Sequence, residues 1–368
     1  MTDVPPVLAT SDQLNQFYLL ANQQIFRSSG AGTYLSLYQT MLSQFNRFGI
    51  NAMPQNHELT GYTFISRPKL NFSTTSLRQD RVLGVLDTPD FNSLQFATRC
   101  YLDSFLTNRH TGFSPLAKKC PFFNWESPFI IPLSNNLMYQ SGWPDPVLEP
   151  ETSDAGFFSE DFTIIKGSDR LNRTYEVNLT FRDILGGFVI SMLYMWHHYI
   201  ELVVRGDTTA YPEDIDARRV NYTCSIYRFI LDQSRQVITK WAKGTGCIPR
   251  SPPLGNMFNY GEGENYIRSA ERFSIPFIVN KVEYMDPIIF RDFNTLVKRF
   301  SPTARAWANG NPGNEVVVAG MDPAQNFIGV PYIDTAGGQN RLDFLCSAAD
   351  LADPYASQLA TFSQQFSI

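Results

Sequence analysis

A chain of 368 residues is long enough for two domains, or for one domain with large insertions, and it can bury a substantial core. Charged residues make up only 18% of the sequence and aromatic residues 14%. This composition favours a subunit that covers much of its surface with neighbours, although an aromatic-rich core would give the same numbers. A net charge of −5 without a dense run of Lys or Arg argues against a nucleic-acid surface, so we expect no sequence-specific nucleic-acid partner.

The first fifty residues of the chain are predicted to be helical. Apolar residues recur at helical spacing over residues 12–28 and 34–48, on either side of a glycine-rich turn. A β-prone run follows at residues 62–65. The next helix is predicted over residues 90–106, with Asp90 as its cap.

Residues 107–160 are rich in proline and aromatic residues, so they are predicted to form a long irregular insertion. Acidic residues gather at 149–161, which indicates an exposed loop. Strands are then expected at 162–166 and 174–179, around a turn of Gly, Ser and Asp.

A strongly apolar helix is predicted over residues 181–204. Residues 184–200 contain no Lys, Arg, Asp or Glu, which is at the short limit for a membrane span. Because glycines and two histidines interrupt this run, we expect a buried core helix and no membrane partner. Its core-facing side chains are predicted to be Leu185, Phe188, Met192 and Trp196.

The last regular elements are a hairpin, a strand and a helix. Strands at 222–231 and 236–242 flank a polar turn, and a further strand is expected over residues 273–282. Pro276 cannot donate a ladder hydrogen bond, so this strand is predicted to lie at an edge of the sheet. A helix at 286–300 follows, with proline in its first turn.

Together these elements predict an α+β fold with a mostly antiparallel sheet flanked by helices. The expected organisation is a helical segment at 1–60, an α+β core at 61–300 and a C-terminal arm or extension at 301–368. The arm is predicted because the tail is rich in Gly, Ala, Asn, Asp and Pro and is expected to order against a neighbouring subunit.

The five cysteines are odd in number and form no C-x-x-C pair, which argues against a disulfide framework or a zinc site. We therefore expect reduced thiols. Cys224 is predicted to be an inert core thiol in a strand, whereas Cys247 is predicted to lie in a loop near Lys243 and Arg250. A structural role is favoured for Cys247, and a stabilised thiolate is the alternative.

No motif in the sequence carries recognisable chemistry. Residues 243–246 (KGTG) place the lysine before the glycines, and residues 261–264 (GEGE) carry carboxylates that would repel phosphate. His197 and His198 are adjacent on a predicted helix, so they cannot chelate one ion together. His57 and His110 lie in polar loops, and the carboxylates of Asp214 and Asp216 indicate a solvated loop. We expect no catalytic, cofactor-binding or metal-binding residues, and no enzyme.

Several segments resemble virion structural proteins of large tailed bacteriophages, above all tail or baseplate components of contractile-tailed phages. They are residues 61–71 (GYTFISRPKLN), 226–231 (IYRFIL), 238–249 (ITKWAKGTGCIP) and 273–277 (FSIPF). The resemblance implies a tail-tube-like β-sandwich in a ring or tube of six-fold symmetry, near the tail tube, the baseplate or the neck. It also implies partners that are copies of the chain itself and other virion proteins, assembled in the bacterial cytoplasm. The long insertion departs from a minimal tube subunit and favours a specialised ring at one end.

A second class of function stays open beside this one, namely a stand-alone soluble binding or enzymatic domain of a phage without a recognisable catalytic motif. The low charge, the predicted edge strand and the predicted arm favour the structural subunit.

Overall fold

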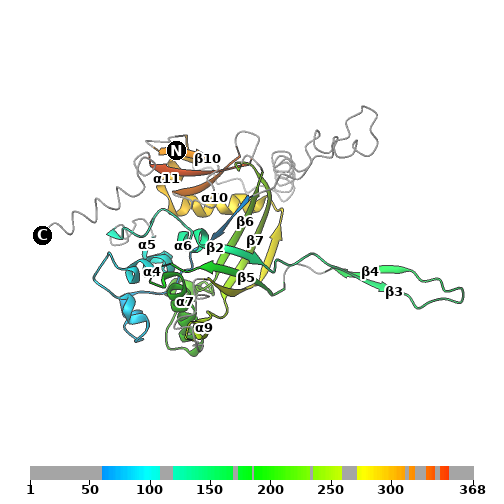
Figure 1. Ribbon diagram of the computed structural model, residues 1–368, viewed down its shortest axis with the longest axis horizontal. Helices are drawn as coiled ribbons and strands as arrows, with labels where there is room; N and C mark the ends of the chain where they lie inside the picture. Colours follow the sequence, from blue (N-terminus) through cyan, green and yellow to red (C-terminus); the bar gives the residue numbers. More distant parts are fainter. Residues whose placement is uncertain are drawn as a thin grey trace, which may run out of the picture. The chain divides into compact units, whose positions relative to one another are not determined.

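Figure 1 shows the computed structural model of the chain, which describes residues 60–107, 119–168, 173–184, 186–232, 235–258, 272–310, 315–319, 329–335 and 340–347. Helices and antiparallel strands are both present, so the predicted α+β class is confirmed. The helices expected at 12–28 and 34–48 lie outside the described residues and stay a prediction.

The chain divides into two compact units, each built from separate stretches of sequence. The α7 unit comprises Thr63–Tyr227 and Lys243–Tyr284, and the α10 unit comprises Met1–Tyr62, Arg228–Ala242 and Met285–Ile368. The boundaries fall inside strands β1 (Thr60–Ile65), β6 (Cys224–Leu231) and β7 (Ile238–Pro249), so these strands contribute residues to both units.

A seven-stranded sheet contains most of the strands, in the order β1-β6-β7-β8-β5-β2, with β9 also paired to β7. The remaining members are β2 (Leu137–Ser141), β5 (Tyr175–Arg182), β8 (Arg272–Val279) and β9 (Lys281–Tyr284). The pairs β2–β5, β5–β8 and β7–β8 are antiparallel. Strands predicted at 62, 174, 222, 236 and 273 are therefore all present in this sheet, with ends that shift by a few residues.

Strand β7 continues to Pro249, well past the predicted end at 242. The sequence predicted a loop for Cys247, which lies within this stretch. Gly246 has φ +68° and lies against the side chain of Asn280, the residue between β8 and β9. A positive φ costs little conformational energy only when the residue is glycine, and glycines with positive φ often mark a bulge in a strand.

The prediction that Pro276 marks an edge strand is wrong, because β8 lies between β7 and β5. The Pro276 carbonyl accepts a hydrogen bond from the backbone N–H of Arg250 at 2.9 Å, just beyond the last residue of β7. In an antiparallel sheet the N and C=O of one residue point toward the same neighbouring strand. The nitrogen of Pro276 therefore points, like its carbonyl, toward Arg250, where β7 has already ended. The missing donor therefore breaks no ladder, and proline is tolerated in an interior strand.

Strands β5 and β8 bury one face only. Their inward residues are Val177, Leu179, Phe181, Phe273, Ile275, Phe277 and Val279. The alternate positions, such as Asn178 and Ser274, are exposed. This alternation is that of a sheet covered on one side.

Helix α7 (Phe188–Arg205) covers the buried face of this sheet. It begins at residue 188 instead of 181, because β5 runs to Arg182 and because Gly186 and Gly187 have φ values of +89° and +65°. Such angles lie outside the helical region. Gly206, also at positive φ, ends the helix as a C-cap.

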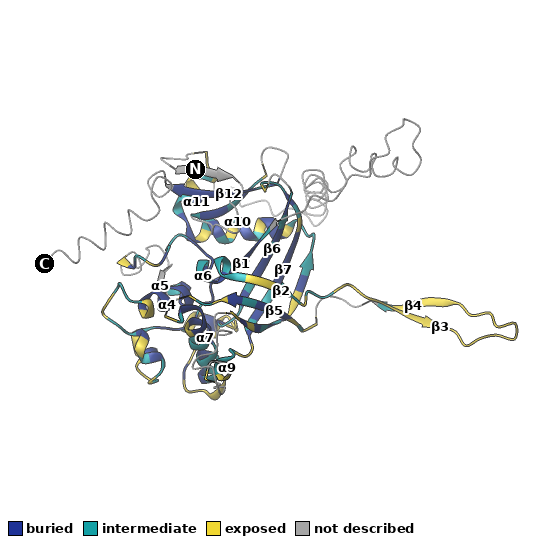
Figure 2. Cartoon of the chain, viewed as in Figure 1, coloured by how far each residue is buried: buried dark blue, intermediate teal, exposed yellow. Residues whose placement is uncertain are grey.

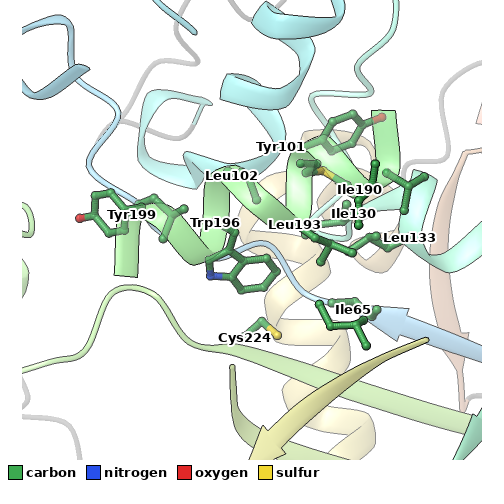
Figure 3. Close-up of a cluster of buried hydrophobic side chains, with 14 of the residues drawn as sticks. Ile65, Tyr101, Leu102, Ile130, Leu133, Ile190, Leu193, Trp196, Tyr199 and Cys224 are labelled. Atoms are coloured by element: carbon green, nitrogen blue, oxygen red, sulfur yellow. The ribbon is translucent and has the colours of Figure 1, made fainter. Parts of the chain in front are cut away.

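The predicted core residues Phe188, Met192 and Trp196 are buried, whereas Leu185 lies outside the described residues. The Trp196 indole donates a hydrogen bond to the Tyr222 carbonyl at 2.9 Å, and its ring meets Phe277 edge-on at 6.4 Å. Figure 3 shows Trp196 and Leu193 on this helix, with Ile65 and Cys224 nearby. Among the described residues, no helix combines the length and apolar character that a membrane span requires.

Shorter helices complete the α7 unit. The helix predicted at 90–106 is divided into α4 (Leu94–Leu102) and α5 (Ser104–Thr107), and Ser93 caps α4 in place of Asp90. The other short helices are α3 (Thr74–Leu77), η1 (Leu83–Leu86), α6 (Ile131–Asn135), α8 (Pro212–Asp216) and α9 (Leu254–Met257). Residues 107–160 are thus not irregular throughout, since α6 and β2 lie within them.

In the α10 unit, helix α10 (Ile288–Phe300) confirms the helix predicted at 286–300. Phe293 packs edge-on against Phe229 at 5.1 Å, and Phe290 lies 4.7 Å from Trp241. The Trp241 indole donates to the Asp286 carbonyl at 2.9 Å, which holds the start of the helix. The helix buries Ile289, Phe290, Phe293, Val297 and Phe300.

A three-stranded sheet, β10-β12-β11, lies in the same unit. Its antiparallel strands are β10 (Glu315–Ala319), β11 (Val330–Asp334) and β12 (Arg341–Ser347), and helix α11 (Pro302–Ala308) precedes them. The Asn294 side chain bonds both the N–H and the C=O of Ile333, at 3.0 and 2.8 Å, so α10 is tied to β11. Leu342 and Phe344 of β12 are buried, so these two residues of the predicted C-terminal arm pack within the unit. The arm expected over residues 301–368 stays a prediction.

We expect Trp196→Ala to lower the free energy of unfolding by about 3–5 kcal/mol, because it leaves a cavity beneath α7 and removes the bond to the Tyr222 carbonyl. Urea denaturation measures this loss. Val204→Ala, at an exposed position of the same helix, is the control and should change stability by less than about 0.5 kcal/mol. Equal effects of the two substitutions would show that the Trp196 site is not the core of this unit.

Candidate assembly surface

Strands β3 (Leu148–Thr152) and β4 (Thr163–Ser168) form a separate antiparallel hairpin. The strand predicted at 162–166 is therefore present, but it does not join the main sheet as expected. Among the described strands, β3 and β4 pair only with each other. The apolar pattern of a strand does not say which strand it pairs with, so the sequence could not decide this point.

The two strands hold each other through backbone pairing and a few side-chain contacts. The hydroxyls of Thr152 and Thr163 hydrogen-bond at 3.1 Å, and Lys166 forms an ion pair with Glu151 at 2.8 Å. The register shifts between Glu149 and Pro150, where Lys166 is the extra residue on β4. A bulge beside a proline is a common feature of a strand that is not in the middle of a sheet.

The tip of the hairpin is shaped by its own hydrogen bonds. Gly156 N–H donates to the Glu160 carbonyl at 2.8 Å, and Phe158 N–H donates to the Glu160 carboxylate at 2.7 Å. Phe157 and Phe158 pack edge-on at 5.2 Å, yet they are 94% and 84% exposed. The tip therefore presents two aromatic rings to solvent on a hydrogen-bonded turn.

More apolar side chains continue along the strands, and Figure 2 shows the hairpin as exposed over nearly its whole length. We define the hairpin apolar surface as Val147, Leu148, Phe157, Phe158, Phe162, Ile164 and Ile165, all of which are more than half exposed. Residues 148–168 also carry five carboxylates against one lysine, a net charge of −4. An isolated two-stranded hairpin is marginally stable in water, and clustered exposed apolar groups mark interaction sites.

The start of the hairpin, by contrast, is anchored in the α7 unit. The Tyr284 hydroxyl donates to the Pro144 carbonyl at 2.6 Å, and the rings of Trp143 and Tyr284 lie 6.2 Å apart. Gly142 has φ +89°, and a side chain there would meet the Glu176 carbonyl at 2.5 Å. The chain thus leaves β2 through a turn that only glycine fits, and then extends into the exposed hairpin.

The structure describes one of the two glycine-rich segments that were expected to lack a phosphate site. Residues 243–246 lie inside β7, where the Lys243 ammonium lies over the Tyr227 ring at 5.5 Å. A lysine buried in a strand is not available to a phosphate-binding loop. Residues 261–264, His57 and His110 lie outside the described residues.

The His198 ring lies 3.1 Å from the Asp80 carboxylate, which gives it a polar neighbour. Burial opposes ionisation of Asp80, but hydrogen bonds from the Leu83 N–H, from His198 and from the Val82 N–H outweigh it, so the pKa of Asp80 is lowered. In the described part of the chain, no three His, Cys, Asp or Glu side chains are grouped so as to hold a metal ion. The absence of catalytic and cofactor sites stays a prediction.

The structure corrects two predictions about polar residues. Asp214 is not in a solvated loop but is buried in α8, 3.1 Å from the Lys69 ammonium. Cys247 does not lie in a loop, because β7 includes it and buries it. All five cysteines are free and buried.

The chain matches, over residues 6–356, the family described as "Putative phage tail tube protein". Because the match covers nearly the whole sequence, the chain belongs to this family of phage tail structural proteins. It is thus a component of a phage tail or a phage-like particle, and the virion resemblance seen in the sequence is confirmed.

Solved structures similar to the chain come from contractile injection systems. The cap that terminates the tube of the anti-feeding prophage is 11% identical, with 40% of this chain and 78% of that chain covered and a TM-score of 0.24. The sheath/tube terminator of the PVC extracellular contractile injection system is 11% identical, with 40% and 84% covered and a TM-score of 0.23. The sheath–tube complex of that system is 12% identical, with 43% and 82% covered and a TM-score of 0.26. These TM-scores are too low to support a statement about the fold. A comparison with curated proteins gives no match.

Sequence reasoning identified the exposed acidic stretch at 149–161, and the structure confirms its exposure. Sequence reasoning did not predict strand β3, and it did not predict that the hairpin exposes an apolar surface. The available signal was the Phe157–Phe158 pair inside a run of carboxylates, because neighbouring charges make burial of both rings within the same chain costly.

Burial, the Asp145 carboxylate and Tyr175 raise the pKa of Tyr284 to about 12. Because the folded state holds this proton more tightly than the unfolded state, the contribution of Tyr284 to stability should be complete below about pH 10 and disappear by about pH 12. Tyr284→Phe removes the titrating group and the bond to Pro144. We expect the stability difference between the two proteins to shrink over this pH range in urea denaturation. A difference that stays constant up to about pH 12 would contradict the assignment.

Proposed function

We propose that the chain is a structural subunit of a phage virion that forms a ring at the tail tube, the baseplate or the neck, and that it acts through subunit–subunit contacts. The observation that carries the proposal is the hairpin apolar surface. Membership of the tail tube protein family supplies the setting in which an exposed hairpin has a use.

The hairpin is built to be covered by another subunit. Phe157, Phe158 and Phe162 are exposed to water. Burying one large aromatic side chain contributes roughly 1.5–3 kcal/mol of favourable free energy to binding. The anchored start at Tyr284 and the hydrogen-bonded tip reduce the ordering cost of binding. A rigid, apolar, two-stranded arm is thus suited to insertion into a neighbour.

A second copy of this chain is the occupant that we propose. In a ring, the contact is heterologous, so the hairpin of one subunit meets a different surface on the next. Strand β2 offers such a surface, because it lies at the end of the strand order and carries Met138 and Tyr139 with more than half of each exposed. Six-fold symmetry and contacts with other tail proteins belong to the same proposal.

The competing function is a stand-alone binding or enzymatic domain. A protein of that kind works as a monomer and gains nothing from an exposed pair of phenylalanines. The two functions therefore differ in oligomeric state and in the effect of changing the hairpin.

We expect the full-length chain to form rings or tubes as its concentration rises, observed by light scattering after size exclusion and by negative-stain electron microscopy. The double substitution Phe157→Asp and Phe158→Asp should keep the protein monomeric, because it places charge on the proposed contact without touching a buried residue. Circular dichroism and the urea midpoint should stay unchanged.

The matched control is Val204→Asp, which changes an exposed apolar residue on α7, outside the hairpin. This variant should assemble like the unaltered chain. If the hairpin variant also assembles normally, the hairpin is not the contact. If the unaltered chain stays monomeric at every concentration, including in the presence of preformed tail particles, the ring proposal is wrong.

A further inference from the structure

Two arginines lie side by side on the face of the main sheet that helix α7 does not cover, which we call the open face. Arg182, the last residue of β5, is paired directly with Arg272, the first residue of β8. Their neighbours Phe181 and Phe273 are also paired and are buried, with their rings 5.9 Å apart. Because successive strand residues point to opposite faces, both guanidinium groups lie on the open face, and both arginines are exposed.

This arginine pair is unfavourable within one subunit. Like charges directly opposite each other in an antiparallel pair of strands are destabilising. In the described part of the chain, neither guanidinium has a hydrogen bond or an ion pair that would offset the repulsion. The carboxylate of the adjacent Asp183 is engaged elsewhere, since it accepts hydrogen bonds from the N–H groups of Ile184 and Val189 at 3.0 and 3.2 Å. The pair therefore presents two positive charges to solvent.

The hairpin carries the opposite arrangement near its tip. Beyond the last paired residues of β3 and β4, the Ser153 N–H donates to the Phe162 carbonyl at 3.0 Å, and the Ser153 hydroxyl accepts from the Phe162 N–H at 3.2 Å. Asp154 and Asp161 take the next positions on the two arms, and both are exposed. Among the described residues, neither carboxylate has a hydrogen bond or an ion pair. Two carboxylates are thus brought side by side at the end of the ladder.

The arginine pair and the aspartate pair match in charge and in spacing. Each consists of two side chains that are neighbours across antiparallel strands, where Cβ atoms lie about 4.5–5.5 Å apart. A guanidinium group binds a carboxylate through two parallel hydrogen bonds, so two arginines can hold two aspartates at once. Aromatic groups accompany both pairs. Tyr139, paired with Thr180 on the open face, is 63% exposed beside the arginines, and Phe157 and Phe158 accompany the aspartates.

The hairpin of the same subunit leaves the sheet at the end that is far from the arginine pair. The chain leaves β2 after Ser141, which pairs with Asn178 in β5, whereas Arg182 is the last residue of β5. Four residues of strand span roughly 13 Å. The stem of the hairpin is fixed at this far end, because Gly142 packs against the Glu176 carbonyl. A hairpin at one end and its complement at the other produce a head-to-tail contact, which gives a ring where the rotation closes.

We propose that Arg182 and Arg272, together with Tyr139, bind the Asp154–Asp161 tip of the hairpin of the next copy of this chain. The proposal rests on the proposed function, since it names the surface that receives the hairpin in the subunit–subunit contact. Each like-charge pair destabilises the lone subunit, and each is neutralised when the two pairs meet. The contact therefore favours the assembled state, and it weakens as salt screens the charges.

The test uses two full-length variants with reversed charges. Arg182→Glu with Arg272→Glu reverses the receiving pair, and Asp154→Arg with Asp161→Arg reverses the hairpin pair. Either variant alone should need at least about tenfold more protein for half-assembly than the unaltered chain, because like charges then face each other across the contact. An equimolar mixture should assemble like the unaltered chain, since each hairpin then meets a receiving pair of opposite charge. Light scattering after size exclusion follows assembly.

The matched control is Arg291→Glu with Arg305→Glu, which makes the same change in net charge at two exposed positions of the α10 unit. This control should assemble by itself and should not rescue the hairpin variant. Recovery of assembly in the mixture also shows that both reversed variants are folded, and circular dichroism checks each of them separately.

The repulsion within the subunit has a test of its own, which does not need assembly. Arg272→Glu by itself places opposite charges across β5 and β8, so it should raise the urea midpoint of the monomer. A midpoint that falls would show that Arg272 is already neutralised within the subunit, and it would remove the basis of the proposal.

The outcomes separate this proposal from the ring function. If the receiving-pair variant assembles normally while the Phe157–Phe158 variant stays monomeric, the receiving site is wrong and the ring function stands. If the mixture of reversed variants stays monomeric, the two pairs do not meet, and the proposal is overturned. If the unaltered chain itself never assembles, both the ring function and the receiving site are wrong.

Discussion

The packing of helix α7 on the buried face of β5 and β8 is the contact on which the α7 unit depends. Trp196 fills the interface with its ring against Phe277 and uses its indole N–H to hold the Tyr222 carbonyl. A buried indole without a partner for its N–H would be costly, so the position of residue 222 and that of the helix are set together. The Tyr199 hydroxyl, one turn further, accepts a hydrogen bond from the Asn71 backbone N–H at 3.1 Å and so brings a third segment to the same helix.

Because α7 covers one face of this part of the sheet, the other face and the hairpin are free for contacts outside the unit. Within one molecule, nothing among the described residues covers Phe157 or Phe158. A protein that worked alone would be expected to replace such residues with charged ones. Family membership and the exposed hairpin therefore both support the proposed subunit–subunit contact.

The hairpin combines an anchored start with an exposed apolar surface. Its start is held by Tyr284 and by a glycine turn at residue 142, and its tip is shaped by the Glu160 carboxylate and carbonyl. These contacts at the start and the tip lower the entropy that the hairpin would lose on binding the proposed neighbour.

Local patterns in the sequence were enough to predict the long helices α7 and α10 and five strands of the main sheet. The alternation in β5, β6 and β8 and the apolar stripes of α7 and α10 identify these elements, because side-chain periodicity follows directly from backbone geometry. The same patterns predicted that 149–161 would be exposed and that Trp196 would be buried.

Only the tertiary structure decided which elements meet. Pro276 is interior because β7 ends at Pro249, β4 pairs with β3 instead of the main sheet, and Cys247 belongs to a strand that the glycines seemed to interrupt. Leu342 and Phe344 lie in a tail polar enough to predict an arm, yet both are buried in β12, and Asn294 ties β11 to α10. Each of these outcomes depends on contacts between residues far apart in the chain, and local composition carries no information about such contacts. The sequence by itself thus determined the longer elements, the burial of α7 and the family, whereas the fold decided the strand order and the exposed hairpin.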